Sequence, residues 1–475
     1  MKKFNILFVL VLMCLSHHVL LAQSLSQQQI ATIENSIVGE MKDANVPGTA
    51  IAIINKNQIA YENHFGFANS QTKTELTDST IYQIASVTKI FAALTLLTEL
   101  EKAGLSPHDS VGNVIQGLSP GLSSITFHQL LTHTSGMIDY HPKKTEYTTT
   151  IFDFFKQNGD NVLFAKPGEV FSYSNTGYAL IGLLIKQLSG KSYPEAVHEA
   201  VIKPLNLQNT TFNFFDVACK SFSVGHYYDY KKKAAIPAIS RFDIPLKQAA
   251  GGIFSNLKDL ERLALCLMNG GILDQEKIFK EDVIQEMSHP HAKNYTTSAN
   301  YYGFMNYPNN AYGYGIFTFD YGDLNFFGNG GSGTQMSYFI YEPKEQFAMI
   351  VISNMSGQFL ISSFKNIFTV VLGEEEPINP AYKADSEEWN EITGKYIFPS
   401  LERKNSRFAL IKEKNGRLFM NFNNSSDIEL KPLDNRVFSY SIPSFRFPIE
   451  IGFYRDNEGN IKYLRHFWRS WIKVE

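Results

Sequence analysis

The chain has 475 residues, of which 44% are hydrophobic and 19% charged, and its formal net charge is -3. This length exceeds what one ordinary core accommodates, so we expect more than one domain. The composition is that of a folded protein and argues against intrinsic disorder. Because nucleic-acid binding needs concentrated positive charge, the acidic balance also argues against a nucleic-acid partner.

Residues 1–22 have the pattern of a secretory signal peptide. Lys2 and Lys3 precede an apolar run over residues 6–15, and the small residue Ala22 stands before a polar segment. A membrane anchor is the alternative, but the run is too short to span a bilayer comfortably, so we expect cleavage after Ala22. The remaining sequence lacks a run of about 18 apolar residues. It therefore predicts no stable membrane span after cleavage and a periplasmic or secreted location.

Cleavage would leave two cysteines, Cys219 and Cys266. In an exported protein such a pair can form a disulfide. Cys266 lies in a helix-like run over residues 260–268, however, where a cysteine more often packs as a small hydrophobe. The sequence leaves both alternatives open.

The hydrophobic pattern predicts strands near both ends of the first 375 residues, with helices between them. This order favours an α/β sandwich, a sheet flanked by helices, with a helical subdomain. The predicted helices cover residues 25–45, 86–104, 176–188, 257–269 and 359–372, with another from Ser192, and the predicted hairpins cover residues 50–69, around Lys56-Asn57, and 336–353.

The character of the sequence changes after residue 375. Residues 376–389 are acidic and contain proline, which is typical of a linker. Residues 390–475 alternate, carry many aromatic residues and break at Asn415-Gly416 and Glu458-Gly459, so we predict a small C-terminal all-β domain. Its Trp468-Arg469-Ser470-Trp471 segment could stack on a sugar or peptide, although a strand packing its own core is the simpler interpretation.

Ser86 and Lys89 lie one turn apart in the predicted helix, and therefore on the same face. The helix is apolar, which does not favour a charged amine. The Ser-x-x-Lys pattern is not specific, because it recurs at Ser70, Ser255, Ser362 and Ser470. Ser86 differs from these because it begins an apolar helix, where free N–H groups and the helix dipole favour a developing negative charge.

Two further segments are candidates for the same site. Tyr173-Ser174-Asn175 directly precedes the predicted helix over residues 176–188, which favours a loop that projects side chains into a cleft. Residues 327–333 contain four glycines just before the strand at Met336. Such a segment either lets a backbone approach a substrate closely or is a flexible turn.

Motifs of other enzyme classes are incomplete. The chain lacks the Gly-x-Ser-x-Gly elbow of α/β-hydrolases. The segments Gly190-Lys191-Ser192, His198-Glu199 and His289-Pro290-His291 each lack residues that a phosphate loop, a zinc helix or a metal site requires. The sequence therefore predicts no metal site.

Taken in order, these elements resemble serine β-lactamases and penicillin-recognising DD-peptidases, in the branch that contains class C β-lactamases and related esterases and peptidases. The resemblance covers about residues 25–375 and implies the family fold, an antiparallel sheet flanked by helices. The segments that carry it are Ser86-Val87-Thr88-Lys89, Leu130–Gly136, Tyr173-Ser174-Asn175, Ala250–Ser255, Tyr312–Gly315 and Asn329-Gly330-Gly331.

The resemblance implies acyl transfer through Ser86. Lys89 would take the proton of the Ser86 hydroxyl, and Tyr173 would relay a proton to the leaving group. Which of the two is the formal base stays open. The resemblance also implies substrate-binding roles for Asn175, Asn329, Gly330 and Gly331, an oxyanion hole formed by the N–H groups of Ser86 and Ser332, and no metal or organic cofactor.

One position departs from the family pattern. Relatives carry Lys or His where this chain has Asn329, and that cation helps to hold a substrate carboxylate. The departure weakens the case for a carboxypeptidase or a strong β-lactamase. We expect an exported serine hydrolase acting on an amide or ester bond of a peptide, peptidoglycan-related or small ester or β-lactam substrate. The alternative is a non-catalytic protein of the same fold that binds cell-wall peptides or another ligand.

Overall fold

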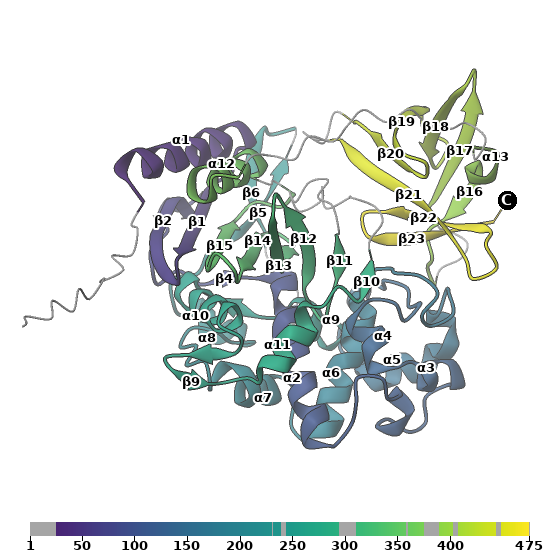
Figure 1. Cartoon of the computed structure of the whole chain (residues 1–475), viewed down its shortest axis with the longest axis horizontal. Coiled ribbons are helices and arrows are strands. Elements are labelled where there is room, and N and C mark those ends of the chain that lie inside the picture. The colour runs from purple at the N-terminus through teal and green to yellow at the C-terminus, as the bar shows by residue number, and fades with distance from the viewer. Residues whose placement is uncertain are drawn as a thin grey trace, which may run out of the picture.

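The computed structural model describes residues 25–229, 231–238, 244–293, 310–357, 360–374, 389–401, 407–442 and 448–474. The predicted signal peptide lies outside the described residues, as does the predicted linker except for Trp389. Figure 1 shows a larger α/β part and a smaller all-β part beside it.

Nine antiparallel strands form the central sheet: β1 (Gly48–Asn55), β2 (Gln58–Asn69), β3 (Thr74–Glu75), β10 (Ala292–Lys293), β11 (Ala311–Tyr312), β12 (Phe317–Tyr321), β13 (Leu324–Ser332), β14 (Met336–Glu342) and β15 (Phe347–Ser353). Their order is β10-β11-β12-β13-β14-β15-β1-β2-β3, so the N-terminal hairpin joins the sheet beside the late strand β15. Both predicted hairpins are present. Lys56 and Asn57 have left-handed φ angles of 51° and 64°, as a two-residue hairpin turn requires.

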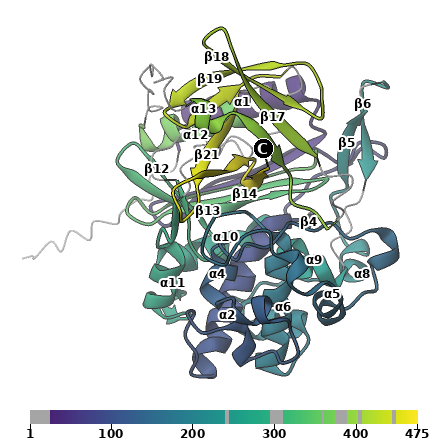
Figure 2. The same cartoon turned by 90° about the vertical axis from the view of Figure 1, so that its right-hand side faces the viewer.

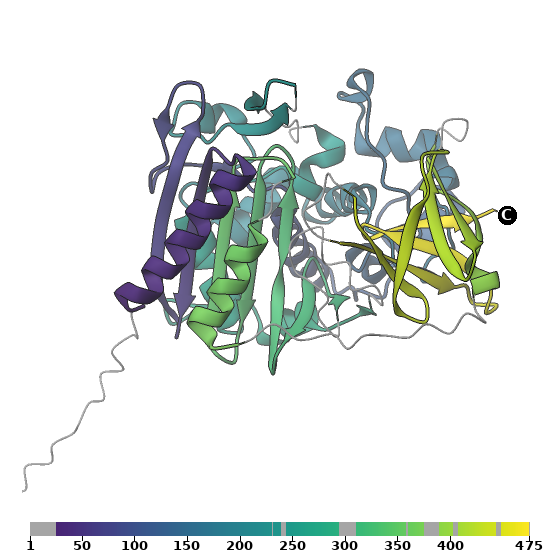
Figure 3. The same cartoon turned by 90° about the horizontal axis from the view of Figure 1, so that it is seen from above.

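Helices cover both faces of the sheet. The helices α1 (Gln27–Ala44) and α12 (Ile361–Leu372) lie side by side on one face, as seen from above in Figure 3. The other face packs against α2 (Thr88–Lys102), α10 (Leu257–Met268) and the helical subdomain. The remaining helices and turns of this part are α3 (Pro120–Ser124), α4 (Phe127–Leu131), α5 (Ile151–Asn158), α6 (Asn175–Ser189), α7 (Tyr193–Val197), α8 (Phe214–Ala218), α9 (Pro245–Gly251), α11 (Glu281–Ser288), η1 (Ala85–Val87), η2 (Val111–Asn113), η3 (Lys144–Glu146), η4 (Gly159–Val162) and η5 (His198–Ile202).

Three short strand pairs complete the larger part. They are β4 (Tyr82–Gln83) with β7 (Phe254–Ser255), β5 (Gly225–Asp229) with β6 (Ala234–Ala238), and β8 (Ile272–Leu273) with β9 (Glu276–Lys277). The strand β4 leads into η1, so its pairing with β7 helps to place Ser86.

The helices α2 and α6 form the centre of the helical layer. Most side chains of α2 are buried, because its sequence is apolar nearly all round, and α2 packs on α6 and α9. The helix α6 ends at Gly190, whose φ of 68° closes it with a left-handed residue. Both helices match the sequence prediction.

The C-terminal part is a closed eight-stranded antiparallel barrel, visible at the top of Figure 2. This confirms the predicted all-β domain, and both predicted breaks are hairpin turns. Closure pairs the first strand with the last and leaves an apolar core inside. After the short helix α13 (Trp389–Ile392), the strands are β16 (Gly394–Ile397), β17 (Phe408–Lys414), β18 (Arg417–Phe422), β19 (Ile428–Asp434), β20 (Val437–Tyr440), β21 (Ile449–Arg455), β22 (Ile461–His466) and β23 (Arg469–Lys473).

Two alternatives left open by the sequence are decided. The glycine-rich stretch is not a flexible turn, because residues up to Ser332 belong to β13. Cys219 is exposed and Cys266 is buried in α10, and neither forms a disulfide.

Among the described helices, none combines the length and the apolar character needed to cross a membrane.

Candidate active site

Ser86 lies in a tight elbow between β4 and α2. Ala85, directly before it, has a φ of 45°, which is strained for a residue with a Cβ. The backbone of Ile84 holds the elbow: its N–H donates to Ile253 O at 3.1 Å, and its carbonyl accepts from Ser337 Oγ at 2.7 Å. Such strain persists only where the surroundings enforce it, so the elbow presents Ser86 in a fixed position ahead of the N-terminus of α2.

Gly331 in β13 lets the sheet approach this elbow. A Cβ added at Gly331 would overlap Ile84 O and Ser337 Oγ and would lie 3.0 Å from Ala85 Cβ. Two of these three atoms belong to the elbow itself. The family-like segment Asn329-Gly330-Gly331 therefore brings a strand into close contact with the Ser86 elbow.

A Gly331→Ala substitution is expected to move Ser86. Overpacking of this kind costs about 1–3 kcal/mol of stability, and a displacement of about 1 Å can reduce turnover about 100-fold. Thermal unfolding and steady-state kinetics measure both effects. Gly39→Ala in α1 is the control, because an added Cβ there meets nothing within 4 Å, so both quantities should be unchanged or slightly improved. Wild-type kinetics in Gly331→Ala would contradict the contact.

The amine of Lys89 is completely enclosed by three neighbours. Its Nζ lies 3.2 Å from Ser86 Oγ, 2.9 Å from Asn175 Oδ1 and 2.7 Å from Ala250 O. Burial lowers the pKa of Lys89 well below its ordinary value; Asp139 opposes this shift and Arg469 adds to it. A neutral amine has two N–H donors and one lone pair. Asn175 and Ala250 can only accept at these atoms, so in the neutral form of Lys89 the lone pair would be left for the Ser86 hydroxyl.

Tyr173 lies beside this pair. Its ring is 4.8 Å from Lys89 Nζ, and its buried hydroxyl lies near the Ser86 hydroxyl. Burial raises the pKa of Tyr173 well above its ordinary value, and the Ser86 hydroxyl opposes that shift in part. The phenol is therefore protonated at neutral pH and is a proton donor rather than an anionic base.

His133 packs against the ring of Tyr173. Its ring centroid is 4.2 Å from that of Tyr173, and its Nδ1 accepts a hydrogen bond from the Ser174 N–H at 3.1 Å. Burial lowers the pKa of His133 well below its ordinary value, so the imidazole is neutral. The segment Leu130–Gly136, which the sequence analysis associated with the family, thus packs against the site.

The barrel contributes a cation to the site. Arg469, at the start of β23, donates from Nε to Asp139 Oδ2 at 2.6 Å and places Nη2 at 2.5 Å from the same atom. The Asp139 side chain is 1% exposed, and its Oδ1 accepts from the Asn175 N–H at 2.9 Å. Burial acts to raise the pKa of Asp139, but Arg469, His141 and the hydrogen bond from the Asn175 N–H together lower it, so the carboxylate is charged.

The turn between β22 and β23 also contacts Tyr173. The Tyr173 N–H donates to Trp468 O at 2.8 Å, and the indole ring of Trp468 lies 4.4 Å from the ring of Phe317. Phe467 and Trp468 have φ angles of 47° and 63°, which bulky residues rarely adopt. Contacts on the catalytic side therefore hold this turn in shape.

Further contacts fix the barrel along the segment that leads to Tyr173. Lys462 Nζ and Tyr463 Oη both donate to Glu169 Oε1, at 2.9 and 2.8 Å. Ser470 donates from its N–H to Ser172 Oγ at 3.1 Å and from its Oγ to Phe171 O at 2.8 Å. The strands β22 and β23 thus form one wall of the site.

The structure brings Ser86, Lys89, Tyr173 and Asn175 together. Asn329 is 1% exposed, and its Nδ2 donates to Gly315 O at 2.7 Å, so this donor is engaged within the protein. Gly330 and Gly331 follow it in β13, and Ser332 ends the strand. Their predicted roles toward a substrate stay predictions.

Asp139 and Arg469 were not predicted as site residues. Arg469 lies in the segment Trp468–Trp471. Trp471 packs in the barrel core, which agrees with the interpretation that this strand packs its own core. Trp468 instead packs with the aromatic residues beside Tyr173. Asp139 carries no recognisable signal, because its partner is 330 positions away.

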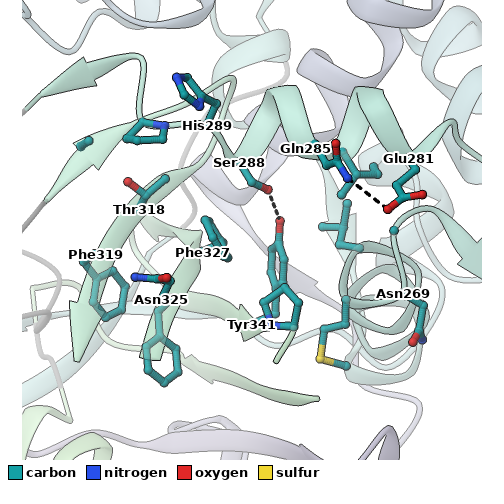
Figure 4. A pocket seen from close by; sticks show the side chains of 18 of the residues that line it. Asn269, Glu281, Gln285, Ser288, His289, Thr318, Phe319, Asn325, Phe327 and Tyr341 are labelled. Atoms are coloured by element: carbon teal, nitrogen blue, oxygen red, sulfur yellow. Dashed lines mark hydrogen bonds between the residues drawn. The ribbon is translucent and has the colours of Figure 1, made fainter. Parts of the chain in front are cut away.

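A separate pocket of about 1190 Å³ lies between α10, α11 and strands β11 to β14 (Figure 4). At its centre Ser288 Oγ and Tyr341 Oη are 3.2 Å apart. None of Ser86, Lys89 and Tyr173 lines it. We therefore assign it no function.

Comparisons with known proteins identify the family and the fold. A family model described as Beta-lactamase matches residues 33–367. Protein flp of Staphylococcus aureus (strain COL) is 25% identical over 359 residues, which cover 74% of this chain and 67% of that protein. The structure of the octameric penicillin-binding protein homologue from Pyrococcus abyssi superposes with a TM-score of 0.64 and 24% identity, covering 94% of this chain and 100% of that chain.

A class C β-lactamase in complex with cefoxitin superposes with a TM-score of 0.60 and 18% identity, covering 73% of this chain and 98% of that chain. The two structural likenesses show the fold, whereas the family model spans most of the chain itself. The protein is thus a member of the β-lactamase family of hydrolases, extended by a C-terminal barrel that reaches its active site.

Proposed function

We propose that the protein is an exported serine hydrolase that cleaves an amide or ester bond through an acyl-enzyme on Ser86. The observation that carries this proposal is the surroundings of the Lys89 amine. Two acceptors bind its N–H groups, and its lone pair is left for the Ser86 hydroxyl. An alcohol becomes an effective nucleophile when a neighbouring base takes its proton, and Lys89 is placed to do so.

The proposed reaction has two steps. In the first, Ser86 Oγ attacks the carbonyl carbon, and its proton passes to Lys89. The bond to the leaving group breaks, the leaving group takes the phenol proton of Tyr173, and Lys89 returns a proton to Tyr173. In the second, water adds to the acyl carbon, the bond to Ser86 Oγ breaks, and a water proton returns to Ser86 through Lys89. Backbone N–H groups of Ser86 and Ser332 would stabilise the oxyanion.

The charges at the site favour substrates that do not depend on a free carboxylate. Asn329 brings no charge, and its Nδ2 is engaged with Gly315 O. Asp139 neutralises Arg469. We therefore propose peptide amides and small esters as the substrate class, ahead of carboxylate-anchored β-lactams.

A panel of chromogenic substrates tests this proposal. Wild-type protein should hydrolyse a short-chain p-nitrophenyl ester or a D-amino-acid p-nitroanilide, with a higher kcat/KM than for a chromogenic cephalosporin. A preference for the cephalosporin would overturn the substrate class. Ligand binding without any turnover would instead favour the non-catalytic protein of the same fold.

Export is supported by Lys2, Lys3, the apolar run over residues 6–15 and Ala22. The intact mass of the protein from its native host decides whether residues 1–22 are removed. A chain that begins at Gln23 agrees with export, and a chain that retains residues 1–22 does not.

A further inference from the structure

A cluster of ionisable side chains lies away from Ser86, where three elements meet. Glu62 and His64 alternate along β2 and therefore lie on one face of the sheet. They pair across the sheet with Ala52 and Ala50, small residues that leave space above the strand. Asp78 reaches the same place from the turn that follows β3, and α10 lies alongside.

The spacing of these groups is close to that of a metal site. One carboxylate or imidazole atom from each of Glu62, His64 and Asp78 lies within 4.8 Å of the others. His64 Nδ1 and Asp78 Oδ1 are 3.6 Å apart. Two ligands bound at about 2.1 Å around a tetrahedral ion are about 3.4 Å apart. Because the Asp78 side chain is 70% exposed, it can close the remaining gap.

A fourth group adds an unpaired carboxylate. Glu261 in α10 is 7% exposed, and its Oε1 has no hydrogen-bond partner among the described residues. The same holds for Oε1 of Glu62. Burial raises the pKa of Glu261 to about 7; the charge of Glu62 adds to this shift, and Lys258 opposes it. Enclosed carboxyl oxygens without partners are unfavourable, and a bound cation would relieve this cost.

Lys258 is a cation beside this cluster, but it pairs poorly with the carboxylates. Lys258 Nζ lies 3.5 Å from Asp78 Oδ2, and both side chains are mostly exposed. It donates no hydrogen bond to the unpaired oxygens of Glu62 or Glu261. Lys258 therefore leaves the Oε1 atoms of Glu62 and Glu261 without a partner.

We propose that Glu62, His64 and Asp78 bind a divalent transition-metal ion such as Zn²⁺. One imidazole together with carboxylates suits Zn²⁺ better than Ca²⁺ or Mg²⁺, which prefer oxygen ligands alone. The ion would join β2 to the turn at Asp78, which lies against the start of α10 through Asn256 and Lys258. That turn continues through β4 into the Ser86 elbow, so the metal would stabilise the fold rather than take part in acyl transfer.

The test is zinc binding by metal-stripped full-length protein at about pH 8, where the ligands are deprotonated. Titration calorimetry should give one site for wild type, and Zn²⁺ should raise the melting temperature. In Glu62→Gln and His64→Gln, affinity should fall at least about 100-fold, because even indirect contributors to a metal site cost 10- to 100-fold. Without metal, Glu62→Gln should be as stable as wild type, since it removes an unpaired carboxylate.

Two further variants separate this site from adventitious binding. Lys258→Met should bind Zn²⁺ more tightly, because it removes a competing cation. Asp282→Asn in α11 removes an exposed carboxylate elsewhere and should bind as wild type does. Equal zinc affinity in wild type, Glu62→Gln and His64→Gln would overturn the proposal, as would a wild-type melting temperature that Zn²⁺ does not raise.

Discussion

Ser86→Ala is expected to lower turnover by on the order of 10⁴- to 10⁶-fold, the usual cost of removing an activated nucleophile. The change leaves the Lys89 lone pair without a proton to accept. Stability should change by about 1 kcal/mol or less, because a single hydroxyl is removed and the elbow is held by the backbone of Ile84. Steady-state kinetics and thermal unfolding measure the two effects.

Ser362→Ala is the matched control. Ser362 also stands three residues before a lysine, but it is exposed on α12, on the face of the sheet opposite α2. It should keep wild-type turnover. Residual turnover above about 1% of wild type in Ser86→Ala would contradict nucleophilic catalysis by Ser86.

Arg469→Met is expected to destabilise the protein and to shift its pH profile. Asp139 would be left buried and charged without its main partner, which costs about 3–5 kcal/mol. Arg469 lowers the pKa of Lys89 and Asp139 raises it, so the substitution raises that pKa. Because only the neutral amine accepts the Ser86 proton, the acidic limb of the kcat/KM profile should move to higher pH.

Asp139→Asn should shift the same limb to lower pH, because it removes the charge that raises the pKa of Lys89. Asp139→Asn should destabilise the protein less than Arg469→Met does, since the Arg469 side chain that it leaves unpaired is 25% exposed and can be hydrated. Lys462→Met is the control: it breaks another contact between the barrel and the catalytic part, at Glu169, and should leave the limb in place. If wild type, Arg469→Met, Asp139→Asn and Lys462→Met all had the same pH profile of kcat/KM, the Arg469–Asp139 pair would not control the pKa of Lys89.

Local patterns were enough to predict the elements that carry Ser86, Lys89 and Asn175. The apolar helix after Ser86 and the helix that ends at Gly190 follow from spacing within about 15 residues, so a single sequence contains their signal. The two hairpins of the sheet follow in the same way. The site residues on these elements converge because the elements pack as the family fold requires.

The rest of the site depends on contacts that local patterns do not encode. Asp139 meets Arg469 only because the barrel docks along Glu169 to Tyr173, and that docking joins segments about 300 residues apart. The glycine-rich stretch had the composition of a turn, but pairing with β14 makes it a strand. The cluster around Glu62 likewise lies against the start of α10, which is distant from β2 in the sequence.

Peptide mapping after brief exposure to a fluorophosphonate tests most directly whether Ser86 is an activated nucleophile. The reagent forms a stable bond with a serine whose proton a neighbouring base can take. We predict a single adduct on the peptide that contains Ser86, forming faster as the pH rises through the pKa of Lys89 and absent from Ser86→Ala. An adduct on a different residue, or none at all, would contradict the mechanism proposed for this site.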